Sequence, residues 1–105
     1  MIRYMLALGV ALAPPPAAEV FGDLRIGDQY VADAALELTC GEETVKGRTD
    51  ATGSFRLSAK SLGKCRLTVT HDGQTPAVDV VLFEKPARYR LVLERKGDTW
   101  TLRRV

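Results

Sequence analysis

The sequence predicts an all-β protein, an antiparallel sandwich of seven to eight strands. After Glu19, apolar and polar residues alternate along the chain, so each segment has one hydrophobic face. Turn-forming residues separate these segments at intervals of roughly 8–12 residues, the spacing typical of a sandwich or small barrel. No window after Glu19 has a helical repeat of apolar residues. Strands are expected at 20–26, 34–40, 44–49, 54–58, 64–71, 77–83, 87–94 and 99–104.

The first 18 residues are predicted to be a secretory signal peptide, with a buried N-terminal helix as the alternative. A positively charged start at Arg3 precedes an uncharged apolar run over 4–13. The run is shorter than the roughly 20 residues that span a membrane, and small residues follow it as at a cleavage site. Cleavage after Ala18 would leave one domain, 19–105, and cleavage after Ala13 also satisfies the small-residue rule. We therefore expect an exported protein, periplasmic or secreted, without a membrane span.

The two cysteines, Cys40 and Cys65, are predicted to form a disulfide. A domain of this length buries only a modest fraction of its surface and often needs a covalent staple. An even number of cysteines in an exported protein favours a disulfide. Both cysteines have the same inward parity as the leucines beside them. No cluster of histidines accompanies them, so we expect neither a metal site nor a cofactor.

A tight hairpin is predicted around Asp50 and Gly53. The Asp50 carboxylate is expected to accept hydrogen bonds from backbone N–H groups two or three residues further on. Gly53 is expected to supply a positive φ without steric cost. Phe55 and Leu57 would then point into the core. A calcium site is a weaker reading, because the loop offers one carboxylate where such sites gather several oxygens.

This hairpin carries a family resemblance. The segment TDATGSFRL at 49–57 is similar to the T-D-x-x-G-x-F/Y-x-L hairpin of carboxypeptidase regulatory-like domains. GDL at 22–24 resembles the opening G-x-V strand of that family, and VADAALEL at 31–38 resembles its second strand. LGKCRLTV at 62–69 resembles its L-x-x-G-x-Y-x-L-x-V segment, with Cys65 where the family usually has a core tyrosine. The resemblance implies a transthyretin-like, antiparallel Greek-key sandwich and a non-catalytic role in stabilisation or recognition.

A catalytic alternative depends on His71, the single histidine of the sequence. Beside Asp72, it could serve a small hydrolase on a transthyretin-like scaffold. His71 ends a predicted strand just before an Asp-Gly turn, which favours a solvated side chain. Transthyretin-related hydrolases use several histidines and a specific C-terminal motif, and the chain has neither; it also lacks a G-x-S-x-G nucleophile motif. We therefore expect a binding or structural module rather than an enzyme.

Basic residues gather in the last two predicted strands. Residues 84–105 hold seven basic and three acidic side chains, whereas residues 19–83 hold seven basic and ten acidic ones. Arg88 and Arg90 share one strand face, and Arg103 is expected to join them across the hairpin. Such a patch favours an anionic partner, either a protein, a lipid headgroup or a polysaccharide, and a solubilising face is the alternative. Nucleic acid is not expected, because no aromatic stacking platform accompanies the arginines.

One predicted strand, 77–83, is apolar on both faces. Val81 and Phe83 lie on one face, and three further apolar residues lie on the other. A half-exposed strand would carry polar residues on its solvent side. We therefore expect either a central strand or a strand that something else covers.

Overall fold

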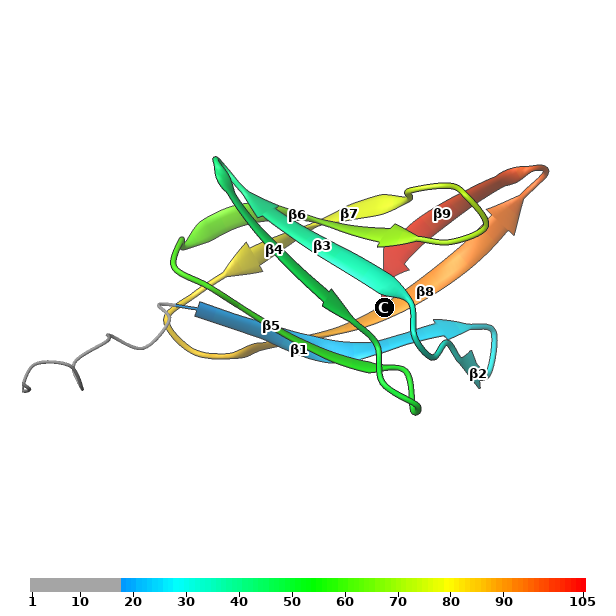
Figure 1. Cartoon of the computed structure of the whole chain (residues 1–105), viewed down its shortest axis with the longest axis horizontal. Helices are drawn as coiled ribbons and strands as arrows, with labels where there is room; N and C mark the ends of the chain where they lie inside the picture. Colours follow the sequence, from blue (N-terminus) through cyan, green and yellow to red (C-terminus); the bar gives the residue numbers. More distant parts are fainter. Residues whose placement is uncertain (1–17) are drawn as a thin grey trace, which may run out of the picture.

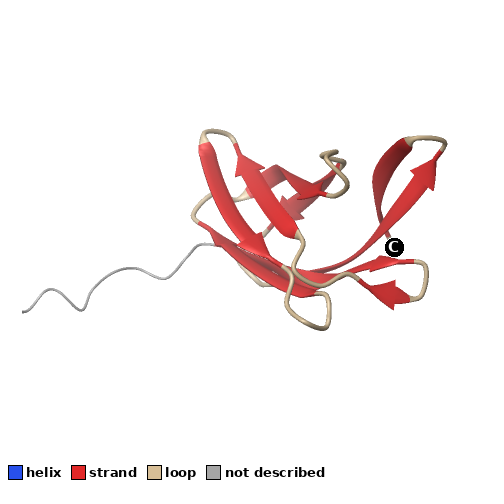
Figure 2. Cartoon of the chain, turned by 45° about the vertical axis from the view of Figure 1, so that its right-hand side comes forward, coloured by secondary structure: helices blue, strands red, loops and turns tan. Residues whose placement is uncertain are grey.

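The computed structural model describes residues 18–105, and within this part of the chain every regular element is a β-strand (Figure 2). Eight of the nine strands match the predicted ones to within two residues at either end. The ninth, β2, has only two residues, too few for an alternating pattern. The strands are β1 (Ala18–Ile26), β2 (Gln29–Tyr30), β3 (Ala35–Cys40), β4 (Glu43–Arg48), β5 (Ser54–Ala59), β6 (Gly63–Thr70), β7 (Ala77–Leu82), β8 (Ala87–Lys96) and β9 (Thr99–Arg104).

The predicted signal peptide lies outside the described residues except for its last residue, Ala18. Ala18 begins β1, is 3% exposed and pairs with Ala59 of β5. The described part of β1 therefore includes one residue before the predicted boundary at Glu19.

The strands form two sheets that pack face to face (Figure 1). One sheet has the order β2-β1-β8-β9, with β5 also paired to β1, and the other has the order β4-β3-β6-β7. Neighbouring strands are antiparallel except β1 and β8, which run parallel, with Gly22 beside Tyr89. The predicted all-β, antiparallel sandwich is confirmed, with this one parallel pair that the sequence did not predict. Alternation of apolar residues records which face of a strand is buried and carries no information about strand direction.

Alternation along each strand builds the core. One buried layer comes from the neighbouring strands β3 and β6, where Leu38 lies beside Leu67. Leu36 and Cys40 of β3 belong to the same layer. Leu24, Leu91 and Leu93 supply the opposite layer from the five-stranded sheet. Each fully buried leucine stabilises the fold by about 1.5–3 kcal/mol.

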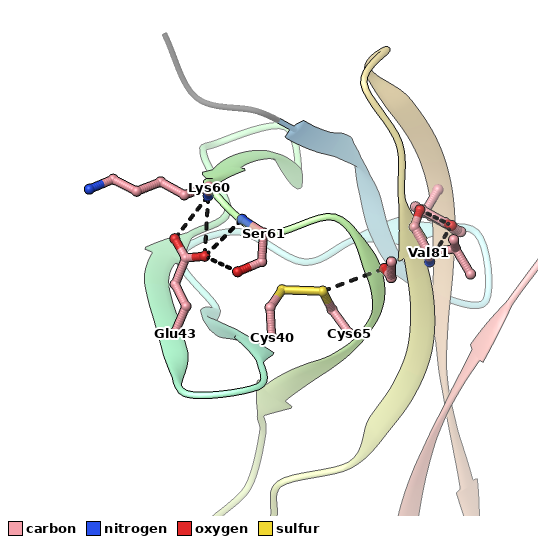
Figure 3. The surroundings of a disulfide bond; sticks show 8 residues. Cys40, Glu43, Lys60, Ser61, Cys65 and Val81 are labelled. Carbon is pink, nitrogen blue, oxygen red and sulfur yellow. Dashed lines mark hydrogen bonds between the residues drawn. A yellow bond between two sulfur atoms is a disulfide. The ribbon is translucent and has the colours of Figure 1, made fainter. Parts of the chain in front are cut away.

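The predicted disulfide joins Cys40, at the end of β3, to Cys65 near the start of β6 (Figure 3). These strands are antiparallel neighbours, and the two Cα atoms lie 4.5 Å apart. Close by, the Glu43 carboxylate accepts hydrogen bonds from the backbone N–H groups of Lys60 and Ser61 and from the Ser61 hydroxyl. This end of the four-stranded sheet is thus fixed both covalently and by hydrogen bonds.

The strand with two apolar faces is β7, which is an edge strand and not a central one. Val80 and Leu82 are buried, Val81 is half-buried, and Phe83 just beyond the strand is 60% exposed. No other element of the described chain covers Phe83. The expectation of a central strand is wrong, because sequence alone does not tell an edge strand with apolar residues from a central one.

Candidate functional site

The outer face of the five-stranded sheet carries four of the seven basic residues that the sequence places near the C-terminus. Cross-strand partners share a face of a sheet, and the register aligns Phe21 with both Arg56 and Arg88, and Asp23 with Arg90. The same face continues across β8 to β9, where Val92 lies opposite Arg103. We call it the arginine face; its charged residues are Arg25, Arg56, Arg88, Arg90, Lys96 and Arg103 with Glu19, Asp23 and Glu94.

Each of the three carboxylates on the arginine face pairs with one arginine. Arg56 binds Glu19, and Arg25 lies 3.9 Å from Asp23. Arg103 donates two hydrogen bonds of 3.1 Å to the two carboxylate oxygens of Glu94. The Arg103 guanidinium holds the pKa of the Glu94 carboxyl below its usual value of 4.5. Arg103, expected to be one third of the basic patch, is therefore largely neutralised by its neighbour.

Arg88 and Arg90 differ from the other three arginines. Both side chains are exposed, and neither makes an ion pair or a side-chain hydrogen bond with another described residue. They stand two residues apart on β8, so their Cα atoms are separated by roughly 7 Å, two strand rises. Five arginines and Lys96 against three carboxylates give the face a net charge of +3. Arg88 and Arg90 carry the part of this charge beside Phe21, whereas Lys96 stands at the far end of β8 near Glu94, whose pKa it helps to lower.

A shallow hollow of about 490 Å³ lies beside Arg88 on the same face. The Phe21 ring forms part of its floor, with the Arg56 guanidinium 5.1 Å from the ring centroid. Asp50 and Ser54 of the neighbouring hairpin complete one side. Arg48, Arg56 and the unpaired Arg88 also line the hollow, against the two carboxylates of Asp23 and Asp50. An anionic group placed here would therefore meet a small excess of positive charge and an apolar ring.

The hairpin that borders the hollow has the geometry expected for Asp50. One Asp50 oxygen accepts hydrogen bonds of 2.9 Å from the backbone N–H groups of Thr52 and Ser54 and from the Thr52 hydroxyl. The Ser54 N–H first, and then the Thr52 groups, hold the pKa of Asp50 below its ordinary value of 3.8. The Asp50 Oδ1 is thus occupied by its own turn, whereas Oδ2 makes no hydrogen bond with the described residues.

Gly53 ends the same turn with a φ of 75°, in the left-handed region. A Cβ at this position would lie 2.9 Å from the carbonyl oxygen of Leu24. The Gly53 carbonyl in turn accepts a hydrogen bond from the Leu24 N–H. The hairpin is therefore pressed against β1, which fixes the border of the hollow.

Gly22 is a positioning residue that the sequence did not single out by any physical argument. A Cβ on Gly22 would lie 1.7 Å from the Tyr89 carbonyl oxygen on the parallel neighbour β8. Only glycine allows the two strands to approach this closely. Gly22 thereby sets the spacing between Phe21 and Arg88. In the sequence, only its place in the GDL segment of the family resemblance indicated that this residue has a special role.

His71 lies at the opposite end of β6 and β7 from Phe83, away from the hollow. Its ring packs edge-on against Trp100, with 4.5 Å between ring centroids, and its Nε2 is 3.7 Å from an Asp72 oxygen. The same Asp72 oxygen accepts a hydrogen bond from the Trp100 indole N–H. The His71 side chain is only 22% exposed, so the expectation that it is solvated is wrong. It packs the β6–β7 turn onto the β8–β9 hairpin.

A second hollow, of about 640 Å³ and mostly apolar, lies at the end of β7. Leu62, Val81, Phe83 and Pro86 line it. Within residues 18–105, no group of three or more histidine, cysteine, aspartate or glutamate side chains is arranged to hold a metal ion. That part of the chain also contains no helix long and apolar enough to cross a membrane.

Comparison with known proteins adds information about the fold. No protein-family model matches the chain, and no curated protein does. The solved structure of Klebsiella pneumoniae 5-hydroxyisourate hydrolase is similar, with a TM-score of 0.59 over 88% of this chain and 96% of that one. The chain has a transthyretin-like fold. Sequence identity to that transthyretin-like hydrolase is 13%, which is evidence for the shared fold alone.

Proposed function

We propose that this transthyretin-like sandwich is a non-catalytic, exported module that binds an anionic partner on its arginine face. The observation that carries the proposal is the division of that face: three arginines each have an internal carboxylate, whereas Arg88 and Arg90 have none among the described residues. Holding two like charges side by side without counter-ions is unfavourable for the isolated fold. An anionic group across Arg88, Arg90 and the hollow beside Phe21 would relieve it.

The assignment to a carboxypeptidase regulatory-like domain is supported by the hairpin that the resemblance singled out. Asp50 binds its own turn, Gly53 has a left-handed backbone, and Phe55 and Leu57 are buried. These four motif residues therefore each have a structural task, which fits a module in which the motif builds the fold and not a catalytic site. The disulfide between Cys40 and Cys65 is compatible with an oxidising compartment outside the cytoplasm.

A non-catalytic role is supported by the surroundings of His71. A general base must come within hydrogen-bond reach of a substrate proton. The His71 ring instead packs against Trp100 beside Asp72, at a structural contact between two turns. The hollow beside Arg88 contains Ser54 but no histidine or cysteine that could activate it.

The proposal is tested by a binding screen with the folded domain at two salt concentrations. The probes are vesicles of phosphatidylglycerol, neutral vesicles of phosphatidylcholine, and a uronic-acid polysaccharide. We expect binding to one anionic probe at 0.1 M salt and release at 1 M, because the Debye length falls from about 10 Å to about 3 Å. Binding that ignores salt, or equal binding to the neutral vesicles, would contradict the proposal. Which anionic probe binds identifies the class of partner.

Export is tested separately by mass spectrometry of protein recovered from the envelope or medium. We expect a mature N-terminus between Pro14 and Glu19, because both candidate cleavage sites lie within that stretch. Recovery of protein that retains Met1 would contradict the export prediction.

A further inference from the structure

The two sheets leave open edges on one side of the sandwich. β7 is the last strand of the four-stranded sheet and β9 the last strand of the five-stranded sheet. On the other side β4 and β5 are the terminal strands, and the chain joins them through the turn at 49–53. An edge strand presents unpaired N–H and C=O groups to which the strand of another chain can add.

At the β7 edge, one side chain occupies both outward backbone groups of Val81. The Tyr89 hydroxyl accepts a hydrogen bond of 2.9 Å from the Val81 N–H and donates one of 3.0 Å to the Val81 carbonyl. Tyr89 belongs to β8, in the opposite sheet. A strand arriving at this edge would have to displace the Tyr89 hydroxyl to pair with Val81.

At the β9 edge the blocking side chain comes from the four-stranded sheet. Gln74, in the turn between β6 and β7, accepts a hydrogen bond of 2.8 Å from the Trp100 N–H. Its amide group donates a bond of 2.7 Å to the Asp98 carbonyl. The Gln74 backbone is itself fixed by two hydrogen bonds of 2.9 Å with His71. Each sheet thus supplies the side chain that occupies the edge of the other.

The amino-acid composition of β7 indicates which kind of strand would pair with its edge if the edge were free. Residues 77–83, AVDVVLF, combine β-branched and aromatic residues with one charge and contain neither proline nor glycine. Segments of this composition pair with identical copies of themselves. Phe83 is 60% exposed and Leu62 is 50% exposed beside it, so apolar surface is ready to be buried. The occupant that fits this edge is therefore a second copy of this chain.

We propose that Tyr89 and Gln74 are reciprocal edge blocks that keep the protein monomeric by denying β7 and β9 to a second copy. β7 packs into the core on one face, and at Val81 its backbone edge is closed by a side chain of its own chain. The inference does not depend on the anionic partner, because both blocks lie on the open side and outside the arginine face.

The test compares Tyr89→Phe, which removes only the hydroxyl, with Tyr30→Phe, which removes the hydroxyl of an exposed tyrosine. Sedimentation velocity over a hundredfold concentration range is the readout. We expect the parent protein and Tyr30→Phe to stay monomeric and Tyr89→Phe to associate as concentration rises. Adding Phe83→Lys to Tyr89→Phe should restore the monomer, because a lysine at an exposed edge repels a second copy.

The second edge is tested by Gln74→Ala against Gln29→Ala, a substitution at an exposed glutamine of β2. If Gln74→Ala associates and Gln29→Ala stays monomeric, a block at β9 is supported. A parent protein that is already dimeric would overturn the proposal. It would also be overturned if Tyr89→Phe and Gln74→Ala, which lack the blocking groups, melt at a lower temperature but stay monomeric at every concentration. If Tyr89→Phe fails to fold, hydrogen exchange in the parent decides: a Val81 amide that exchanges as fast as an exposed one contradicts the block.

Discussion

The hairpin at 49–54 and the arginine face border the same hollow but differ in how their polar groups are satisfied. In the hairpin, the Thr49 hydroxyl donates to the Val31 carbonyl at 2.7 Å and accepts from the Ala34 N–H at 2.8 Å. The Asp50 carboxylate accepts three hydrogen bonds from its own turn. On the arginine face, Arg88 and Arg90 have no such partner among the described residues.

This difference separates residues that build the fold from residues that are available for binding. A polar group with all its hydrogen bonds made inside the chain stabilises the native state and has little left to offer a ligand. A charge held at the surface without a counter-ion adds nothing to stability and retains its attraction for an outside partner. Substitutions in the two regions should therefore have opposite profiles: loss of stability in the first and loss of binding in the second.

The largest effect on stability is expected at Gly22, on β1, the strand that lies between the hairpin strand β5 and the arginine-bearing strand β8. Gly22→Ala places a Cβ against the Tyr89 carbonyl, so β1 and β8 must separate. We expect a loss of about 4 kcal/mol or more in urea unfolding, or no folded protein. Gly27→Ala is the control: nothing lies within 4 Å of a Cβ there, and only the left-handed backbone costs about 1–2 kcal/mol. Equal effects of the two substitutions would show that close strand approach is unimportant.

The disulfide gives the next largest effect. The double variant Cys40→Ala/Cys65→Ala releases a loop of 25 residues, which implies a loss of roughly 3–4 kcal/mol in the chain-entropy model. Urea unfolding of the parent with and without reductant measures the same difference. Two titratable thiols in the native exported protein would contradict the bond.

A smaller effect is expected at Asp50. Asp50→Ala removes three hydrogen bonds from an exposed turn and should lower the Tm by a few degrees. The folded-state pKa of Asp50 is lowered, so its contribution is complete above pH 3.8 and is lost as the pH falls through the lowered value. The Tm difference between parent and variant should therefore shrink in acid. A difference independent of pH would mean that the carboxylate is not the stabilising group.

Much of the fold could be predicted from the sequence because most of its strands are half-buried. Alternation placed β3, β6 and β8 to within two residues, and the parity of Cys40 and Cys65 placed the disulfide. The parallel pairing of β1 with β8 was missed, because alternation is the same in either strand direction. The edge position of β7 was missed because two apolar faces are typical of a central strand; the Tyr89 hydroxyl on its outward backbone is a long-range contact that local sequence does not record.

The candidate site could be predicted only in part. The sequence predicted that Arg88 and Arg90 share one face of β8, because residues two apart on a strand point to the same side. The neutralisation of Arg103 depends on a diagonal contact with Glu94 across the β8–β9 hairpin, which requires the register of Val92 opposite Arg103. The hollow beside Phe21 requires β5, β1 and β8 to be neighbours, although they are far apart along the chain. Sequence thus indicated the charges but not which of them remain unpaired.

The central claim, that the unpaired arginines bind an anionic partner, is tested most directly by two double variants with the same change in net charge. Arg88→Gln/Arg90→Gln removes the unpaired arginines, and Arg66→Gln/Arg103→Gln removes two that are paired with Asp79 and Glu94 and do not line the hollow beside Phe21. Affinity for the anionic probe that the parent binds is measured at rising salt, with the Tm as a check on folding. We predict that the first variant loses about tenfold in affinity and most of its salt dependence with an unchanged Tm, whereas the second binds nearly as the parent does. Equal affinity of the two variants would contradict the account, because binding would then depend on net charge and not on the two unpaired arginines.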